Sequence, residues 1–100
     1  MATTIKALVR AAAGTSTATL YTVPASTTTV VTNIVVTNSA ASAATFTLTL
    51  DGVDIFTTTA IAANSTAMFD LKQVMATTKI IAGFASAATV KFHISGVEIA

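Results

Sequence analysis

Residues 43–58 read AATFTLTLDGVDIFTT, and this stretch decides the fold class of the chain. From Thr45 to Leu50 threonine alternates with phenylalanine or leucine, so the apolar side chains lie on one face of an extended strand. Asp51 and Gly52 then separate two strand-like segments, and a two-residue Asp-Gly connection is typical of a type I′ turn, which needs positive φ at both positions. The stretch therefore predicts an antiparallel β-hairpin.

The same two-residue period runs through most of the chain. Near its end the apolar residues Val90, Phe92 and Ile94 alternate with polar ones. No segment shows the 3.6-residue spacing of an amphipathic helix, and the best helical candidate, Asp70–Met75, is one turn at most. Turn-forming residues divide the chain into eight predicted strands: Thr4–Ala11, Ala18–Val23, Thr28–Thr37, Ala43–Leu50, Val53–Thr58, Thr66–Leu71, Lys79–Phe84 and Thr89–Ile99.

Short strands at this spacing predict an all-β protein: a single-domain β-sandwich of jelly-roll or immunoglobulin-like type, with about eight short antiparallel strands. One hundred residues without a break in composition suit one domain with one modest core, which we place at residues 1–100. We expect that core to contain the larger apolar side chains of the alternating strands: Phe46, Leu48, Phe69, Val90, Phe92 and Ile94.

The composition excludes several classes of function. Only 9% of the residues are charged, against about 25% in an average protein, and none of them lies between Ala11 and Leu50. The net charge of +1 comes from scattered side chains, so no basic patch for nucleic acid is expected. The lack of cysteine rules out disulfides and thiolate metal sites.

The high mean hydropathy, +0.78, raises the question of a membrane segment. Threonine, serine or asparagine interrupts every apolar run, whereas a spanning helix needs about 20 predominantly apolar residues. Lys6 and Arg10 interrupt the first apolar segment, so residues 1–14 do not fit a signal peptide. We therefore expect no membrane partner.

Candidate catalytic and metal-binding residues are few. His93, the only histidine, is expected on the exposed face of its strand, and nothing in its spacing indicates a Ser–His–Asp triad. Asp51 and Asp54 flank the hairpin turn and Asp70 lies elsewhere, whereas a calcium ion takes about six to eight oxygen ligands. We predict that the protein is not an enzyme and has no catalytic residues, no cofactor and no metal.

The chain also contains six short motifs: LYTVPAS (Leu20–Ser26), VTNIVVTN (Val31–Asn38), the Asp51–Gly52 hairpin after TLTL, IAANST (Ile61–Thr66), FDLKQV (Phe69–Val74) and VKFHISGVEI (Val90–Ile99). In this order they resemble a group of small virion proteins of tailed bacteriophages, over residues 18–100 and more weakly over the first 17. Ser26 stands where that group has glycine, and Thr77–Thr78 where a Gly-Asp turn is usual. The motifs are structural, so the resemblance implies an architecture and a virion setting.

We accordingly predict a non-enzymatic structural protein of the virion, with capsid decoration (cement) as the favoured role and assembly in the host cytoplasm. A β-rich chain with forty uncharged residues in a row is an aggregation hazard as a free monomer, so other copies of the chain are expected to cover its edges, with a trimer favoured. The major capsid protein or other virion proteins would be the further partners. The alternative is an accessory subunit of the neck, tail, fibre or spike that binds a receptor or glycan, for which Tyr21 and Phe56 are the aromatic candidates.

The first strand is the candidate attachment element, with residues 1–14 as an edge strand or interface arm. Strict alternation places Lys6, Leu8 and Arg10 together on its outer face. Charges on an edge discourage uncontrolled pairing, and Leu8 between two charges would be poorly placed in water. We expect Leu8 to be buried against a partner, with Lys6 and Arg10 at the rim of the contact. A single exposed leucine is the alternative.

Overall fold

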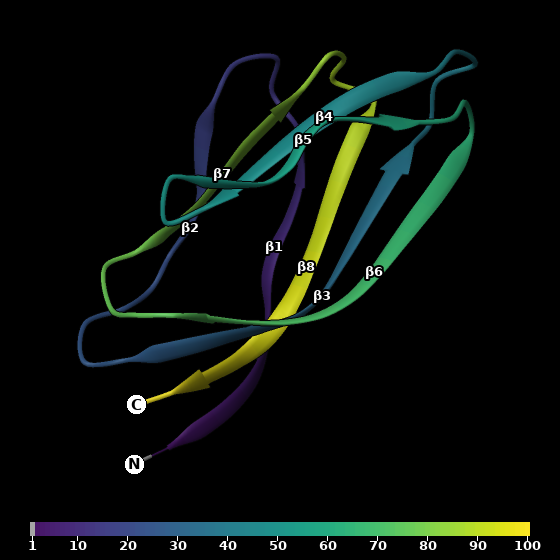
Figure 1. The fold of residues 1–100 in the computed structure, drawn as a ribbon. Helices are drawn as coiled ribbons and strands as arrows, with labels where there is room; N and C mark the ends of the chain where they lie inside the picture. The colour runs from purple at the N-terminus through teal and green to yellow at the C-terminus, as the bar shows by residue number, and fades with distance from the viewer. Residues whose placement is uncertain (1) are drawn as a thin grey trace.

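The computed structural model describes residues 2–100, so Met1, with which the predicted domain and arm begin, lies outside the described residues. Within this range the regular structure consists of strands, which confirms the predicted all-β class with eight antiparallel strands in a sandwich (Figure 1). The segment Asp70–Met75 belongs to one of them. The strands are β1 (Thr3–Ala12), β2 (Ala18–Thr22), β3 (Thr28–Asn38), β4 (Ala44–Leu50), β5 (Val53–Ile61), β6 (Ser65–Met75), β7 (Ile80–Ala85) and β8 (Val90–Ile99).

The strands form two four-stranded sheets that face each other across the core. Sheet A has the order β1-β8-β3-β6 and sheet B the order β2-β7-β4-β5. The antiparallel pairing is nested, because β4 pairs with β5, β3 with β6, β2 with β7 and β1 with β8. The chain is thus one long hairpin folded over on itself, with the tip at Asp51–Gly52 and its two ends side by side (Figure 1).

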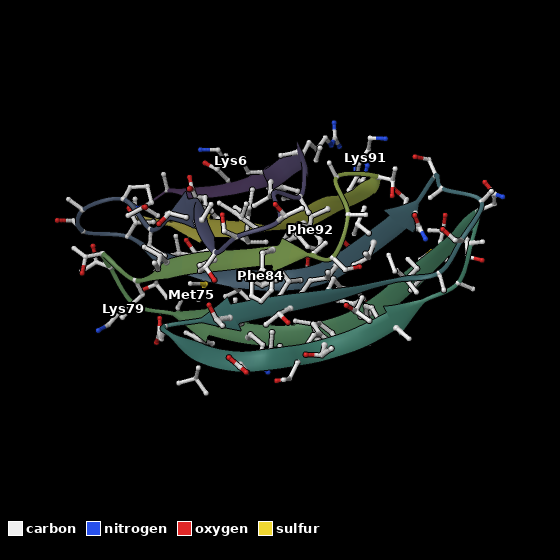
Figure 2. All side chains as sticks on the ribbon, turned by 90° about the horizontal axis from the view of Figure 1, so that it is seen from above. Lys6, Met75, Lys79, Phe84, Lys91 and Phe92 are labelled. Carbon is white, nitrogen blue, oxygen red and sulfur yellow. The ribbon has the colours of Figure 1, made fainter. Side chains whose placement is uncertain are left out.

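The core lies between the sheets where alternation predicted it. Five of the six expected core residues are at most 1% exposed, and Phe69 is half-buried and packs against them. The ring centroid of Phe46 in β4 lies 6.0 Å from that of Phe92 in β8 and 5.5 Å from that of Phe56 in β5. An aromatic cluster therefore joins the two sheets. Figure 2 shows the alternation directly: Phe92 points between the sheets and its neighbour Lys91 points away from them.

The outer face expected for the first strand is wrong for Lys6 and Leu8 and correct for Arg10, because β1 contains a β-bulge. Its register against β8 shifts between Ala7 and Val9, which leaves Leu8 as the extra residue. Both Leu8 and Val9 are therefore buried, at 8% and 5% exposure, and Leu8 belongs to the core of its own chain. The bulge also separates the two charges: Lys6 lies opposite Gly96, on the core-facing side of the sheet, and Arg10 lies opposite His93, on the outer side.

Several turns place residues in the left-handed region of backbone space. Asp51 and Gly52 have φ of 59° and 76°, as the predicted type I′ turn requires. Ser26, in the turn after β2, and Thr78, in the turn after β6, have φ of 55° and 68°. Non-glycine residues adopt this conformation at an energetic cost.

The ends of the described chain are held by each other. The backbone amide of Ala2 donates to the carbonyl of Ala100 at 2.9 Å, and the amide of Ala100 donates to the carbonyl of Ala2 at 2.8 Å. These bonds extend the β1–β8 ladder to the end of sheet A, which places both ends at one pole of the molecule (Figure 1).

Candidate functional site

The residues considered as catalytic or metal-binding candidates are dispersed over the structure. His93 is exposed on the outer side of sheet A, between Arg10 of β1 and Val35 of β3. Asp54 is exposed beside the hairpin turn and accepts a hydrogen bond from Thr57 Oγ1 at 2.8 Å. Within residues 2–100 no group of three or more histidine or acidic residues lies close enough together to hold a metal ion.

Four polar side chains, Glu98, Tyr21, Thr29 and Lys6, form a connected group that we call the Glu98 cluster. The Tyr21 hydroxyl donates to Glu98 Oε2 and lies 2.9 Å from Thr29 Oγ1. Lys6 Nζ lies 3.4 Å from Glu98 Oε1 at the rim, where 48% of the lysine side chain is exposed. Because Tyr21 comes from β2 of sheet B and the others from sheet A, the cluster fastens the two sheets together.

Tyr21 is held in its neutral form. Burial of the phenol, followed by its hydrogen bond to Glu98, raises the pKa of Tyr21 to about 12 from the ordinary value of 10.0. A phenol with this pKa stays protonated at neutral pH and acts as a hydrogen-bond donor, not as a base. The hydrogen bonds of Tyr21 connect side chains of the two sheets, and the ion pair of the cluster joins Lys6 to Glu98 within sheet A.

Spectrophotometric titration will test the Tyr21 environment, because Tyr21 is the only tyrosine and the chain lacks tryptophan. We expect the folded protein to ionise with a pKa near 12, and the chain in guanidinium near 10. Since folding raises the pKa, the stabilisation from Tyr21 is complete below pH 10 and is lost as the pH rises through about 12.

The matched variant for this titration is Glu98→Gln, which keeps a hydrogen-bond acceptor but removes the negative charge. Its Tyr21 pKa should fall part of the way back toward 10, because burial, the larger cause, remains. A wild-type pKa equal to that of the unfolded chain would show that the hydroxyl faces solvent.

The outer side of sheet A presents the largest exposed apolar side chains that lie together. Ile5 of β1 neighbours Val97 of β8, Val97 neighbours Val30 of β3, and Val30 neighbours Val74 of β6. Directly opposed residues point to the same side of a sheet, so these four form one apolar row across all four strands. Ile5 is 86% exposed and Val74 is 71% exposed, and the two central residues are half-buried.

Two further rows complete the middle of this outer face. Next to the apolar row lie Ala7, Ser95, Asn33 and Asp70, one from each strand. Beyond them lie Arg10, His93, Val35 and Met68, of which Met68 is 77% exposed. A pocket of about 280 Å³, lined by Asn33, Met68, Phe69 and Asp70, opens between β3 and β6.

The three residues predicted to form an interface do not share a surface. Lys6 contributes to the Glu98 cluster, Leu8 lies in the core and Arg10 lies on the outer face of sheet A. Sequence reasoning missed the apolar row because its four members are far apart in the chain and meet only through strand register. A signal for the bulge was present: Leu8 and Val9 are consecutive apolar residues within an alternating strand.

Buried polar groups do not mark a hidden site. Among the described residues every buried side-chain nitrogen or oxygen has a hydrogen-bond partner. The most enclosed example is Asn38, 2% exposed, which donates to the carbonyls of Ser42 and Ala62 and accepts from the amide of Ala40 and the hydroxyl of Thr89. This amide therefore ties together the loops at one pole of the sandwich.

In residues 2–100 no helix is long and apolar enough to cross a membrane.

Comparison with known proteins gives a distant structural likeness. No family model matches the chain, and no curated protein matches it. Among solved structures it is similar to a pentameric capsid protein isolated from metagenomic phage sequences, with 18% sequence identity and a TM-score of 0.43. The likeness covers 90% of this chain but 58% of that protein, so the chain spans less than two thirds of the length of its structural neighbour.

Proposed function

We propose that the chain is a non-enzymatic structural protein of a bacteriophage virion and that it acts as a capsid decoration protein. The observation that carries the proposal is the outer face of sheet A, where an apolar row crosses four strands and ends in two largely exposed side chains, Ile5 and Val74. Apolar patches of this kind mark surfaces that bind another protein. The dispersed polar candidates and the structural chemistry of the Glu98 cluster fit the same role.

The surface chemistry supports binding in an ordered array. Threonine and alanine each supply 21 of the 100 residues, and long charged side chains are few. Short side chains lose little conformational entropy when a neighbour immobilises them. A protein that binds the assembled lattice, and not its separate subunits, stabilises the lattice by mass action.

The nested strand order supports the jelly roll among the two predicted sandwich types. In an immunoglobulin-like sandwich the first strand pairs with the second, whereas here β1 pairs with β8. Double-sheet jelly rolls occur in viral capsid and lectin domains. Because this is an analogy of fold alone, it supports a place in a virion. The role within the virion has to be argued from the surface residues.

The receptor- or glycan-binding alternative gains no support from the two aromatic residues that it requires. The ring of Phe56 lies 4.4 Å from that of Phe69, inside the aromatic cluster of the core. Tyr21 is half-buried and engaged with Glu98. An accessory place in the neck or tail remains the alternative location for the same structural role.

Quantitative mass spectrometry of purified particles of the phage that encodes the chain tests this proposal. A decoration protein is expected at hundreds of copies per particle, and particles lacking it should lose their DNA at a lower temperature, with restoration when the purified protein is added back. About a dozen copies would place the chain in the neck or tail. Absence from the particle would refute the virion role.

The trimer predicted from the composition stays a prediction. The exposed surface instead offers a contact between two copies.

A further inference from the structure

We infer that the outer face of sheet A packs against the same face of a second copy of this chain. In this contact Arg10 of each copy enters the pocket that Asn33, Met68, Phe69 and Asp70 line on the other, here called the Asp70 pocket. The inference deepens the proposed function, on which it rests, by naming the surface and the symmetry of the self-association. Its evidence is independent of the fold analogy: the apolar row, the pocket and the position of two charges that have no ion-pair partner within residues 2–100.

The face is large enough for a stable contact. Its central strands are 10 and 11 residues long. Four strands about 4.8 Å apart, with about ten residues at about 3.3 Å each, present about 600 Å². Two such faces packed together would bury about 1,200 Å² in total, which reaches the range of specific protein interfaces, about 1,200–2,000 Å².

Packing the same face of two copies together requires a two-fold axis. Such a contact is isologous, because both copies contribute the same surface: if residue i of one copy contacts residue j of the other, then residue j of the first contacts residue i of the second. The axis must lie in the plane between the two sheets, and the sheet gives it two simple directions, along the strands or across them. Sheets stacked in this way keep their strands within about 30° of each other at a separation of about 10 Å.

The charges favour the axis along the strands. This axis places β1 of one copy over β6 of the other, so Ile5 meets Val74 in the apolar row and Arg10 arrives above Met68, one row from Asp70. The axis across the strands would place β1 of one copy over β1 of the other and bring Arg10 toward Arg10 of the second copy. Opposite charges therefore meet in the first arrangement, and like charges are excluded from contact.

The pocket completes the fit for an arginine. It is lined by the apolar residues Met68 and Phe69 and by the polar residues Asn33 and Asp70. An arginine buries its methylene stem along apolar surface and offers a planar set of donors to a carboxylate. Lys72, the other exposed charge on this part of β6, lies beyond Asp70 from the arriving Arg10 and does not come between them.

The apolar part is tested with Ile5→Lys and Val74→Lys, each on a site exposed enough to leave the fold intact. Sedimentation velocity over a range of concentrations should give twice the 10.1 kDa mass for the wild type and at least a tenfold weaker dissociation constant for each variant. Val53→Lys is the matched control, since Val53 is 68% exposed on β5 of the other sheet, and it should dimerise as the wild type does.

The charge part is tested by complementation. Arg10→Asp gives a copy with acidic groups at both positions, and Asp70→Arg gives one with basic groups at both. Each variant alone should be monomeric at concentrations where the wild type is a dimer, because both of its cross-copy pairs are repulsive. A one-to-one mixture should form a heterodimer, because both pairs are then attractive. Lys79→Glu, in the turn before β7, is the charge control and should leave the dimer unchanged.

The outcomes separate the inference from the proposed function. A wild type that stays monomeric, that forms a trimer or pentamer, or that dimerises unchanged in Ile5→Lys overturns the inference, as does a mixture that stays monomeric. Circular dichroism of each variant identifies any loss of fold. A chain that is abundant in the particle but fails these tests keeps its virion role and uses another surface, whereas a dimer that is absent from the particle keeps the interface and loses the role.

Discussion

Replacing Phe92 with alanine is expected to lower the free energy of unfolding by about 3–5 kcal/mol. Phe92 is fully buried in β8, and the centroid of its ring lies 6.0 Å from that of Phe46 in the opposite sheet. Alanine would remove this contact and leave a cavity that two hydrogen-bonded sheets cannot close completely. Because domains of this size are stable by about 5–15 kcal/mol, the loss is a large part of the total.

Urea unfolding followed by far-ultraviolet circular dichroism measures this effect. Phe92→Leu should cost less, since leucine fills more of the site than alanine. Val53→Ala, at a side chain that is 68% exposed, should change the stability by no more than about 0.5 kcal/mol. If Phe92→Ala unfolds at the same urea concentration as the wild type, the ring is not part of the core.

Gly96→Ala should destabilise the protein by about 1–3 kcal/mol or more, although it adds a single methyl group. A Cβ at Gly96 would lie 2.3 Å from the carbonyl oxygen of Val30 and 2.9 Å from Leu8 Cδ1. The carbonyl belongs to the backbone of β3, which is paired on both sides, so it cannot move without straining the ladder. Glycine is required here by the close approach of two strands.

Gly14→Ala is the matched control. Gly14 lies in the loop after β1, and the nearest atom to an added Cβ is the carbonyl oxygen of Ser16 at 3.7 Å. The same substitution there should be neutral within about 0.5 kcal/mol. Equal melting temperatures for the Gly14→Ala and Gly96→Ala proteins would contradict the predicted crowding between β8 and β3.

Local patterns were enough to predict the strands and the hairpin. Alternation in Thr45–Leu50 and Val90–Ser95 placed Phe46, Leu48 and Phe92 in the core correctly, because the side-chain period of a strand is fixed by its backbone. The Asp51–Gly52 turn was predicted because few dipeptides tolerate positive φ at both positions.

Features that depend on one extra residue or on distant pairing were out of reach. The bulge turns both Leu8 and Val9 toward the core, and strict alternation, which assigns consecutive residues to opposite faces, therefore placed Leu8 on the wrong side. Tyr21 and Glu98 are 77 positions apart and meet only because β2 of one sheet packs against β8 of the other. The apolar row from Ile5 to Val74 depends on the register of the strands in sheet A.

The nested pairing also sets the order in which this chain can fold. The tip at Asp51–Gly52 closes the shortest loop, whereas the β1–β8 contact that joins Ala2 to Ala100 closes a loop of nearly the whole described chain. Longer loops cost more chain entropy, and topologies rich in distant contacts fold in milliseconds to seconds. We expect the hairpin to form early and the edge strand β1 to dock late. Until β1 docks, the edge of β8 that β1 will cover is free. During this interval β8 of one newly made chain can pair with a strand of another chain instead of with its own β1.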